Sequence, residues 1–199
     1  PADTEALTYR GWAQVRAGDV EAALRDLDQA VEINDSYLDA RVFRAVTLAE
    51  LERFDEAASD LRAFDELQPT QLMRQIVTQN FLRERIIAGV LLAEDAPSFA
   101  DSGFTADHVV AAAEYHAEMG EPAEAARLLD VVLAAEPDNV EALAARGWVL
   151  ARVGVQAGDT KVTDRGLADI EAALAIDPDH PGALVYRSFT LMFGYDDTA

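Results

Sequence analysis

Carboxylates are the side chains best supplied for chemistry here, because 37 of the 199 residues are Asp or Glu and only three are His. There is no Cys, which excludes disulfides, thiolate nucleophiles and Cys-based metal sites. The spacing of His108, His116 and His180 matches no metal-binding motif, and the sequence has no glycine-rich phosphate loop or G-x-S-x-G motif. We therefore expect a non-catalytic protein without a metal or cofactor.

Three Arg and three Asp residues recur together at two fixed positions of repeated segments: Arg10 with Asp26, Arg44 with Asp60, and Arg146 with Asp169. A further segment lacks both members and has Ala112 and Leu128 instead. Joint presence and joint absence predict an Arg–carboxylate ion pair within each segment. The alternative function of these arginines is an anion site.

Trp12 and Trp148 also share one position of two repeated segments. Trp is favoured at interfaces because it offers a large apolar area with a polar group, so both are candidate anchors for a partner. The alternative is that each Trp packs on a neighbouring helix. Five acidic residues are predicted on the same face: Glu5, Asp39, Asp107, Glu114 and Glu141.

A repeat of 34 residues positions these side chains. The segment Glu5-Ala6-Leu7, followed by Arg10-Gly11-Trp12, recurs as Glu141-Ala142-Leu143, followed by Arg146-Gly147-Trp148. The spacing equals four periods of 34 residues. The repeats start near Thr4, Leu38, Ala106 and Val140.

This pattern resembles the tetratricopeptide-repeat (TPR) family. Small residues recur where two helices must approach closely, large residues where they fill the gap, and Pro69, Pro137 and Pro178 where the second helix ends. Gly18, Gly120 and Gly154 are expected in the turns between helices. The resemblance implies an all-α, right-handed superhelix of helix-turn-helix repeats, with about ten helices and a concave groove lined by the first helix of each repeat.

Two stretches depart from the repeat. Residues 72–91 predict one long amphipathic helix packed on the second repeat, and residues 94–105 predict a loop, although a degenerate repeat is the alternative. The fourth repeat carries seven extra residues between Gly154 and Gly166. Because seven residues make about two helical turns, the insertion either lengthens the helices or forms a protruding loop.

The predicted domains are two repeats at 1–71, a connector at 72–105, and two repeats plus a fifth first helix at 106–199. The last segment, Tyr186-Arg187-Ser188-Phe189, is similar to Phe43-Arg44-Ala45-Val46 but lacks a second helix. We therefore expect the repeat array to continue beyond Ala199, and the chain to be part of a longer protein.

The net charge of −21 indicates the class of partner. Such a surface repels nucleic acids and anionic membranes and favours a basic protein or peptide. No run of 18 apolar residues is present, so direct membrane insertion is not expected. The groove positions contain neither Lys nor Asn, which the carboxylate clamp of chaperone-binding TPRs requires. We therefore do not expect a chaperone C-terminus as the ligand.

Four segments also resemble bacterial TPR proteins of cytochrome c maturation: residues 141–148, 157–160, 165–168 and 177–184. That resemblance implies a chaperone that holds apocytochrome c on the extracytoplasmic face of the membrane; a cytoplasmic location is the alternative. Two other functions are a structural scaffold that self-associates through its ends, and a regulatory domain of a larger protein.

Overall fold

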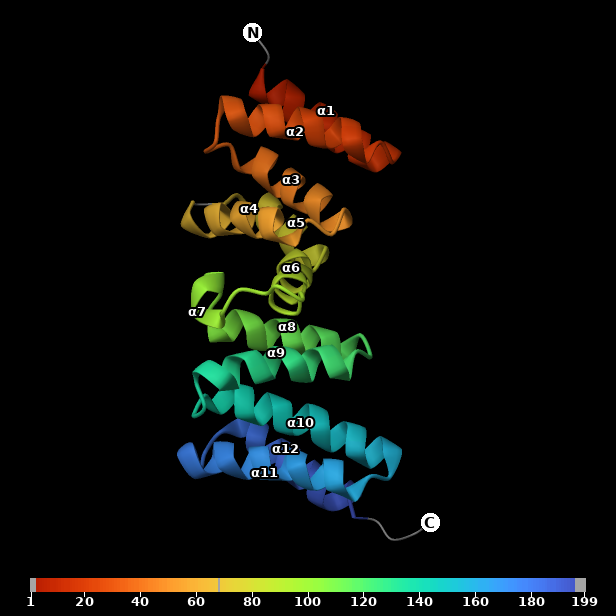
Figure 1. The fold of residues 1–199 in the computed structure, drawn as a ribbon, viewed down its shortest axis with the longest axis vertical. Coiled ribbons are helices and arrows are strands. Elements are labelled where there is room, and N and C mark those ends of the chain that lie inside the picture. Colours follow the sequence, from red (N-terminus) through yellow and green to blue (C-terminus); the bar gives the residue numbers. More distant parts are fainter. Residues whose placement is uncertain (1–2, 68, 196–199) are drawn as a thin grey trace. The chain divides into compact units, whose positions relative to one another are not determined.

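The structure is a computed structural model that describes residues 3–67 and 69–195 (Figure 1). In these residues it contains twelve α-helices, against about ten expected, and no strand. The chain divides into two compact units, residues 1–90 and residues 91–199, which are described separately. Residues 1–2, 68 and 196–199 of the predicted domains lie outside the described residues.

Unit 1 contains the two predicted helix pairs, α1 (Thr4–Ala17) with α2 (Val20–Ile33) and α3 (Leu38–Glu50) with α4 (Phe54–Glu66). In the first pair the turn depends on Gly18, whose φ of 83° is readily available only to glycine. Asp19 then caps α2, because its carboxylate accepts a hydrogen bond from the backbone N–H of Ala22.

Small residues hold the first helix pair close together. A Cβ atom added at Gly11 of α1 would lie 2.8 Å from Cγ of Leu27 in α2. Leu27 and Ala23 are fully buried at this crossing, so the large side chain fills the space that the small residues leave. Equivalent residues of the second repeat are also buried: Ala45, Ala57 and Leu61.

The prediction of one long helix over residues 72–91 is wrong. The stretch forms α5 (Gln71–Gln79) and α6 (Leu82–Leu91), with a break at Asn80 and Phe81. Phe81 has a φ of 46°, which ends the helical path. The backbone N–H and the side-chain amide of Asn80 both donate to the carbonyl of Ile76. α5 packs on α3, as predicted, while Arg83 of α6 pairs with Asp65 of α4.

Unit 2 contains two further pairs and a single helix. The pairs are α8 (Ala106–Glu118) with α9 (Pro122–Ala135) and α10 (Val140–Ala157) with α11 (Thr160–Ile176). The fifth first helix, α12 (Pro181–Phe193), packs on both α10 and α11. The predicted loop at 94–105 also contains one helical turn, α7 (Phe99–Ser102), which contacts α9.

The insertion of the fourth repeat lengthens both helices, so the protruding-loop alternative is wrong. The turn lies at Gly158, whose φ is 66°, and not at Gly154 as predicted. Gly154 is buried inside α10, where an added Cβ atom would lie 2.4 Å from the backbone N of Thr163. The extra turns therefore continue the close crossing of α10 and α11, and Gly154 serves that crossing.

Candidate functional site

The first helices of unit 2 enclose a pocket of about 220 Å³, here called the Trp148 pocket. α10 packs against α8 on one side and against α12 on the other. Their inward-facing side chains and Leu129 of α9 line the pocket: Glu114, Ala117, Glu118, Leu129, Ala145, Trp148, Val149, Arg152 and Tyr186. The aromatic and apolar walls suit an apolar group, and the carboxylates suit a positive charge.

A second pocket of about 290 Å³ adjoins the first, because both are lined by Glu114, Ala145 and Tyr186. Its remaining lining comes from the start of α10 and the start of α12, and includes Glu141 and His180. We call the two pockets together the acidic groove. It lies on the first helices of the repeats, which is the face that the TPR resemblance predicts.

The structure shows that Trp148 packs on a neighbouring helix, whereas its role as an anchor for a partner stays a prediction. The indole is half-buried and stacks on the ring of Tyr186, with centroids 4.8 Å apart and an interplanar angle of 13°. Phe189 meets the same indole edge-on at 5.0 Å. Trp148 thus packs on the neighbouring helix and also lines the pocket.

Glu114 is the carboxylate that both pockets share. Desolvation by its neighbours, followed by the negative charges of Glu141 and Glu118, raises the pKa of Glu114 above its ordinary value. The opposing charge is Arg152, which donates to the carbonyl of Ala117 at 2.7 Å. Three carboxylates and one guanidinium therefore line the groove, and its net charge is negative.

His180 joins the groove to the cap of α12. Its Nδ1 accepts a hydrogen bond from the backbone N–H of Ala183, so its Nε2 carries the proton and lies 3.0 Å from the Glu141 carboxylate. The buried imidazole thus fixes one carboxylate of the groove. His116 is also buried, with its Nδ1 2.6 Å from a carboxylate oxygen of Glu121.

The predicted groove residues of unit 1 form a different arrangement. Trp12 stacks on Phe43 of α3, with ring centroids 4.4 Å apart. The Tyr9 hydroxyl donates to Asp39 at 2.8 Å, and this hydrogen bond raises the pKa of the Tyr9 phenol. Glu5 is exposed at the start of α1. Asp39 is therefore already engaged by a hydroxyl.

Only some of the predicted acidic residues lie close together in the structure. Glu114 and Glu141 line the acidic groove together, whereas Asp107 is exposed in the first turn of α8 and lines neither pocket. Tyr186 was not among the predicted groove residues, although its alignment with Phe43 pointed to it. Each aromatic residue stacks on the Trp of the preceding first helix.

The three Arg–Asp ion pairs predicted from the spacing are present. The shortest N–O distances are 2.6 Å for Arg10–Asp26, 2.8 Å for Arg44–Asp60 and 2.7 Å for Arg146–Asp169. In each pair two guanidinium nitrogens donate to the two carboxylate oxygens, which is the bidentate geometry that Arg favours. The pairs join the two helices of one repeat.

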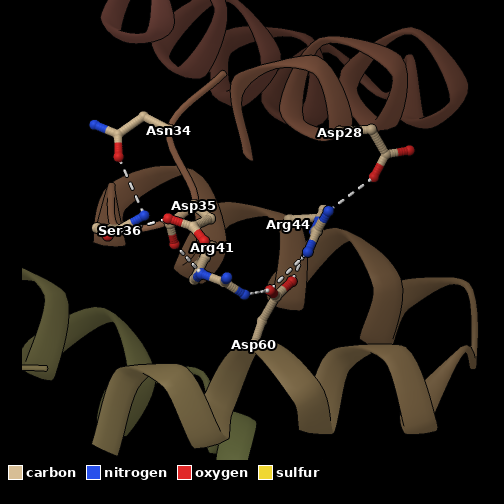
Figure 2. A network of polar contacts seen from close by, with 7 residues as sticks. All are labelled: Asp28, Asn34, Asp35, Ser36, Arg41, Arg44 and Asp60. Atoms are coloured by element: carbon tan, nitrogen blue, oxygen red, sulfur yellow. Dashed lines mark hydrogen bonds and ion pairs between the residues drawn. The ribbon is translucent and has the colours of Figure 1, made fainter. Parts of the chain in front are cut away.

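A second set of acidic residues, missed at the sequence level, extends these pairs between repeats. Arg44 reaches Asp28 of α2 at 3.2 Å (Figure 2), and Arg146 reaches Asp130 of α9 at 2.7 Å. Asp28 and Asp130 occupy equivalent positions in their repeats, and this recurrence could have identified them. These arginines therefore link consecutive repeats as well as the two helices of one repeat.

None of the described helices is long and apolar enough to cross a membrane. Within residues 3–67 and 69–195, no group of three or more His, Asp or Glu residues is arranged to hold a metal ion.

Several solved structures are similar to this chain. YrrB, described as a TPR protein with an unusual peptide-binding site, is 16% identical, with a TM-score of 0.43 over 94% of this chain and 92% of that one. TTC0263, a thermophilic TPR protein of Thermus thermophilus, is 18% identical, with a TM-score of 0.38 over 96% and 100% of the two chains. MamA is 14% identical, with a TM-score of 0.38 over 88% and 92%.

The family assignment comes from the sequence. No curated protein matches the chain in sequence. The family model of the tetratricopeptide repeat matches residues 10–71 and 110–154, together more than half of the chain. The chain belongs to the tetratricopeptide-repeat family.

Proposed function

We propose that this protein binds a polypeptide and that the acidic groove of unit 2 is its binding surface. Tetratricopeptide repeats are generally non-catalytic modules of protein–protein interaction, and their stacked helices create extended binding surfaces. One observation supports this groove as the surface: two adjoining pockets are lined by aromatic, apolar and carboxylate groups of consecutive first helices. Recesses of this composition are the usual form of ligand sites.

The partner is expected to carry positive charge. Glu114, Glu118 and Glu141 line the groove, and the net charge of −21 attracts basic molecules over a longer range. Trp148 is the expected apolar anchor, because half-buried Trp residues often dominate binding energy. Trp12 stays a predicted contact in unit 1.

Panning a random-peptide display library on the protein tests this proposal. Selected peptides should be rich in Lys and Arg, and should bind the variant Glu114→Lys at least about tenfold more weakly. Glu32→Lys is the matched control, because it makes the same charge change on an exposed position of α2. Failure to select any peptide, or an equal loss of affinity in both variants, would contradict the proposal.

Self-association is a second candidate because α12 exposes large apolar side chains. Val185, Leu191 and Met192 are 65%, 54% and 68% exposed. A second copy of the chain could cover this face, since exposed apolar patches often mark interfaces. Light scattering should then show a mass that rises with concentration for the wild type and stays monomeric for Met192→Glu. A monomeric mass for both proteins would exclude this candidate.

A further inference from the structure

We infer that the Trp148 pocket is a subsite for one arginine side chain of the bound polypeptide. This inference rests on the proposed function and adds the chemical class of residue that the groove selects. The pocket volume of about 220 Å³ lies below the roughly 300–1,000 Å³ of sites for drug-sized ligands, which suits a single side chain. The adjoining pocket of about 290 Å³ leaves room for neighbouring residues of the same peptide.

The pocket lining matches both parts of an arginine side chain. Leu129, Ala145 and Val149 provide apolar surface for the methylene stem. Trp148 and Tyr186 provide aromatic surface, on which a planar guanidinium stacks favourably. Because the two rings already stack on each other at 4.8 Å, their positions are fixed before a ligand arrives. A preformed aromatic wall reduces the ordering cost of binding.

The charges in the pocket favour a basic side chain over an acidic one. Within the described residues, neither Glu114 nor Glu118 forms an ion pair, so both carboxylates are available to a cation. The single guanidinium, Arg152, already donates to the carbonyl of Ala117. An anionic ligand would therefore meet two carboxylates and one guanidinium, a net negative charge, whereas a guanidinium can donate to the carboxylates in a bidentate manner.

The state of Glu114 in the free protein supports this reading. Desolvation and the charges of Glu141 and Glu118 raise its pKa, so its ionised form is disfavoured in the empty pocket. Arg152, His180 and Tyr186 are the other titratable groups that line the two pockets. A bound cation would stabilise the carboxylate, so affinity should fall as the pH decreases through the raised pKa of Glu114.

Matched pentapeptides provide the test. The peptides are acetyl-Ala-Ala-X-Ala-Ala-amide, in which X is arginine, lysine or citrulline, the neutral analogue of arginine with nearly the same shape. Binding is followed by NMR at the indole N–H of Trp148, and a Trp12→Phe variant assigns this signal. We expect the arginine peptide to bind at least about tenfold more tightly than the citrulline peptide, and more tightly than the lysine peptide. The double variant Glu114→Gln/Glu118→Gln should lower the affinity for the arginine peptide to that for the citrulline peptide. The control variant Glu21→Gln/Glu32→Gln on α2 should leave both affinities unchanged.

The outcomes separate this inference from the proposed function. Equal binding of the arginine and citrulline peptides at Trp148 would overturn the arginine subsite and leave the groove as a peptide site. Tighter binding of the lysine peptide would replace arginine with an ammonium ligand and also overturn the inference. If no pentapeptide shifts the Trp148 signal while display-selected peptides bind the groove, the subsite is again wrong. If neither class of peptide binds, the proposed function fails as well.

Discussion

At the residue scale, burial decides what each repeated Arg–Asp pair contributes. The side chain of Asp60 has no exposed area and accepts hydrogen bonds from both Arg41 and Arg44 (Figure 2). Asp26 pairs with Arg10, whose side chain is 62% exposed. Water screens an exposed pair, whereas the loss of one partner from a buried pair leaves an uncompensated charge in the interior.

The first prediction compares these two positions. Asp60→Ala should lower the free energy of unfolding by about 3–5 kcal/mol, because it leaves Arg41 and Arg44 without their buried partner. Asp26→Ala should lower the free energy of unfolding by clearly less. Urea unfolding followed by circular dichroism measures both values. If Asp26→Ala lowers the free energy of unfolding as much as Asp60→Ala does, burial does not control what each ion pair contributes to stability.

The second prediction concerns acid stability. Hydrogen bonding from Arg10 lowers the pKa of Asp26, despite its partial desolvation. A carboxyl group whose pKa is lowered on folding stabilises the fold above its ordinary pKa of about 3.9, and this contribution disappears as the pH falls through the lowered value. The stability difference between the wild type and Asp26→Asn should therefore shrink between about pH 6 and pH 2. A stability difference that stays constant over this pH range would contradict the lowered pKa of Asp26.

At the element scale, close helix crossings define the repeats, and the crossing of α10 and α11 brings backbone atoms of the two helices close together. A Cβ atom added at Gly166 would lie 2.4 Å from the backbone N of Ala151 and 2.5 Å from the carbonyl oxygen of Gly147. Such distances require the two helices to separate, because backbone atoms cannot turn aside as a side chain can.

The third prediction follows from this geometry. Gly166→Ala should destabilise unit 2 by about 1–3 kcal/mol, although Ala favours helix formation by about 1 kcal/mol relative to Gly. Gly182→Ala in the first turn of α12 is the control, since the nearest atom to its added Cβ would be a side-chain carbon of His180 at 3.3 Å, which needs to move by only a few tenths of an ångström. Thermal unfolding of the two variants gives the comparison. Stabilisation by Gly166→Ala would show that the crossing is looser than described.

The helix pairs were largely predictable from the sequence because small and large residues recur with the period of the repeat. Gly11 and Leu27, placed by that period, meet across α1 and α2. The break at Phe81 was not predictable, because the apolar pattern continues through it and the left-handed backbone of one residue leaves no periodic trace. Gly154 was misplaced for a related reason: glycine serves both turns and close crossings, and only the packing against Thr163 distinguishes them.

The candidate site was less predictable than the fold. Trp12 and Trp148 both lie on first helices, as the repeat predicts, and their role as anchors for a partner stays a prediction. Their shared position did not show that Trp148 would line a pocket with Tyr186, because this depends on how α12 packs against α10. The resemblance to cytochrome c maturation proteins, and the extracytoplasmic location that it implies, stay predictions.

At the scale of the whole molecule, the net charge of −21 should govern the speed of association. The fourth prediction is that a basic, display-selected peptide binds more slowly as salt rises from about 0.05 M to about 0.5 M, because ions screen the long-range attraction. Stopped-flow Trp fluorescence measures this rate, and the dissociation rate should change less. An association rate independent of salt would indicate that binding is driven by apolar contact alone.

Locating the bound peptide tests the central claim most directly. The measurement is an amide NMR titration of the isotope-labelled protein with a display-selected peptide. Polypeptide binding in the acidic groove predicts that the largest shift changes occur in α8, α10 and α12, at Glu114, Ala145, Trp148 and Tyr186. Changes centred instead on the second helices α9 and α11, or confined to unit 1, would contradict the assignment of the groove as the binding surface.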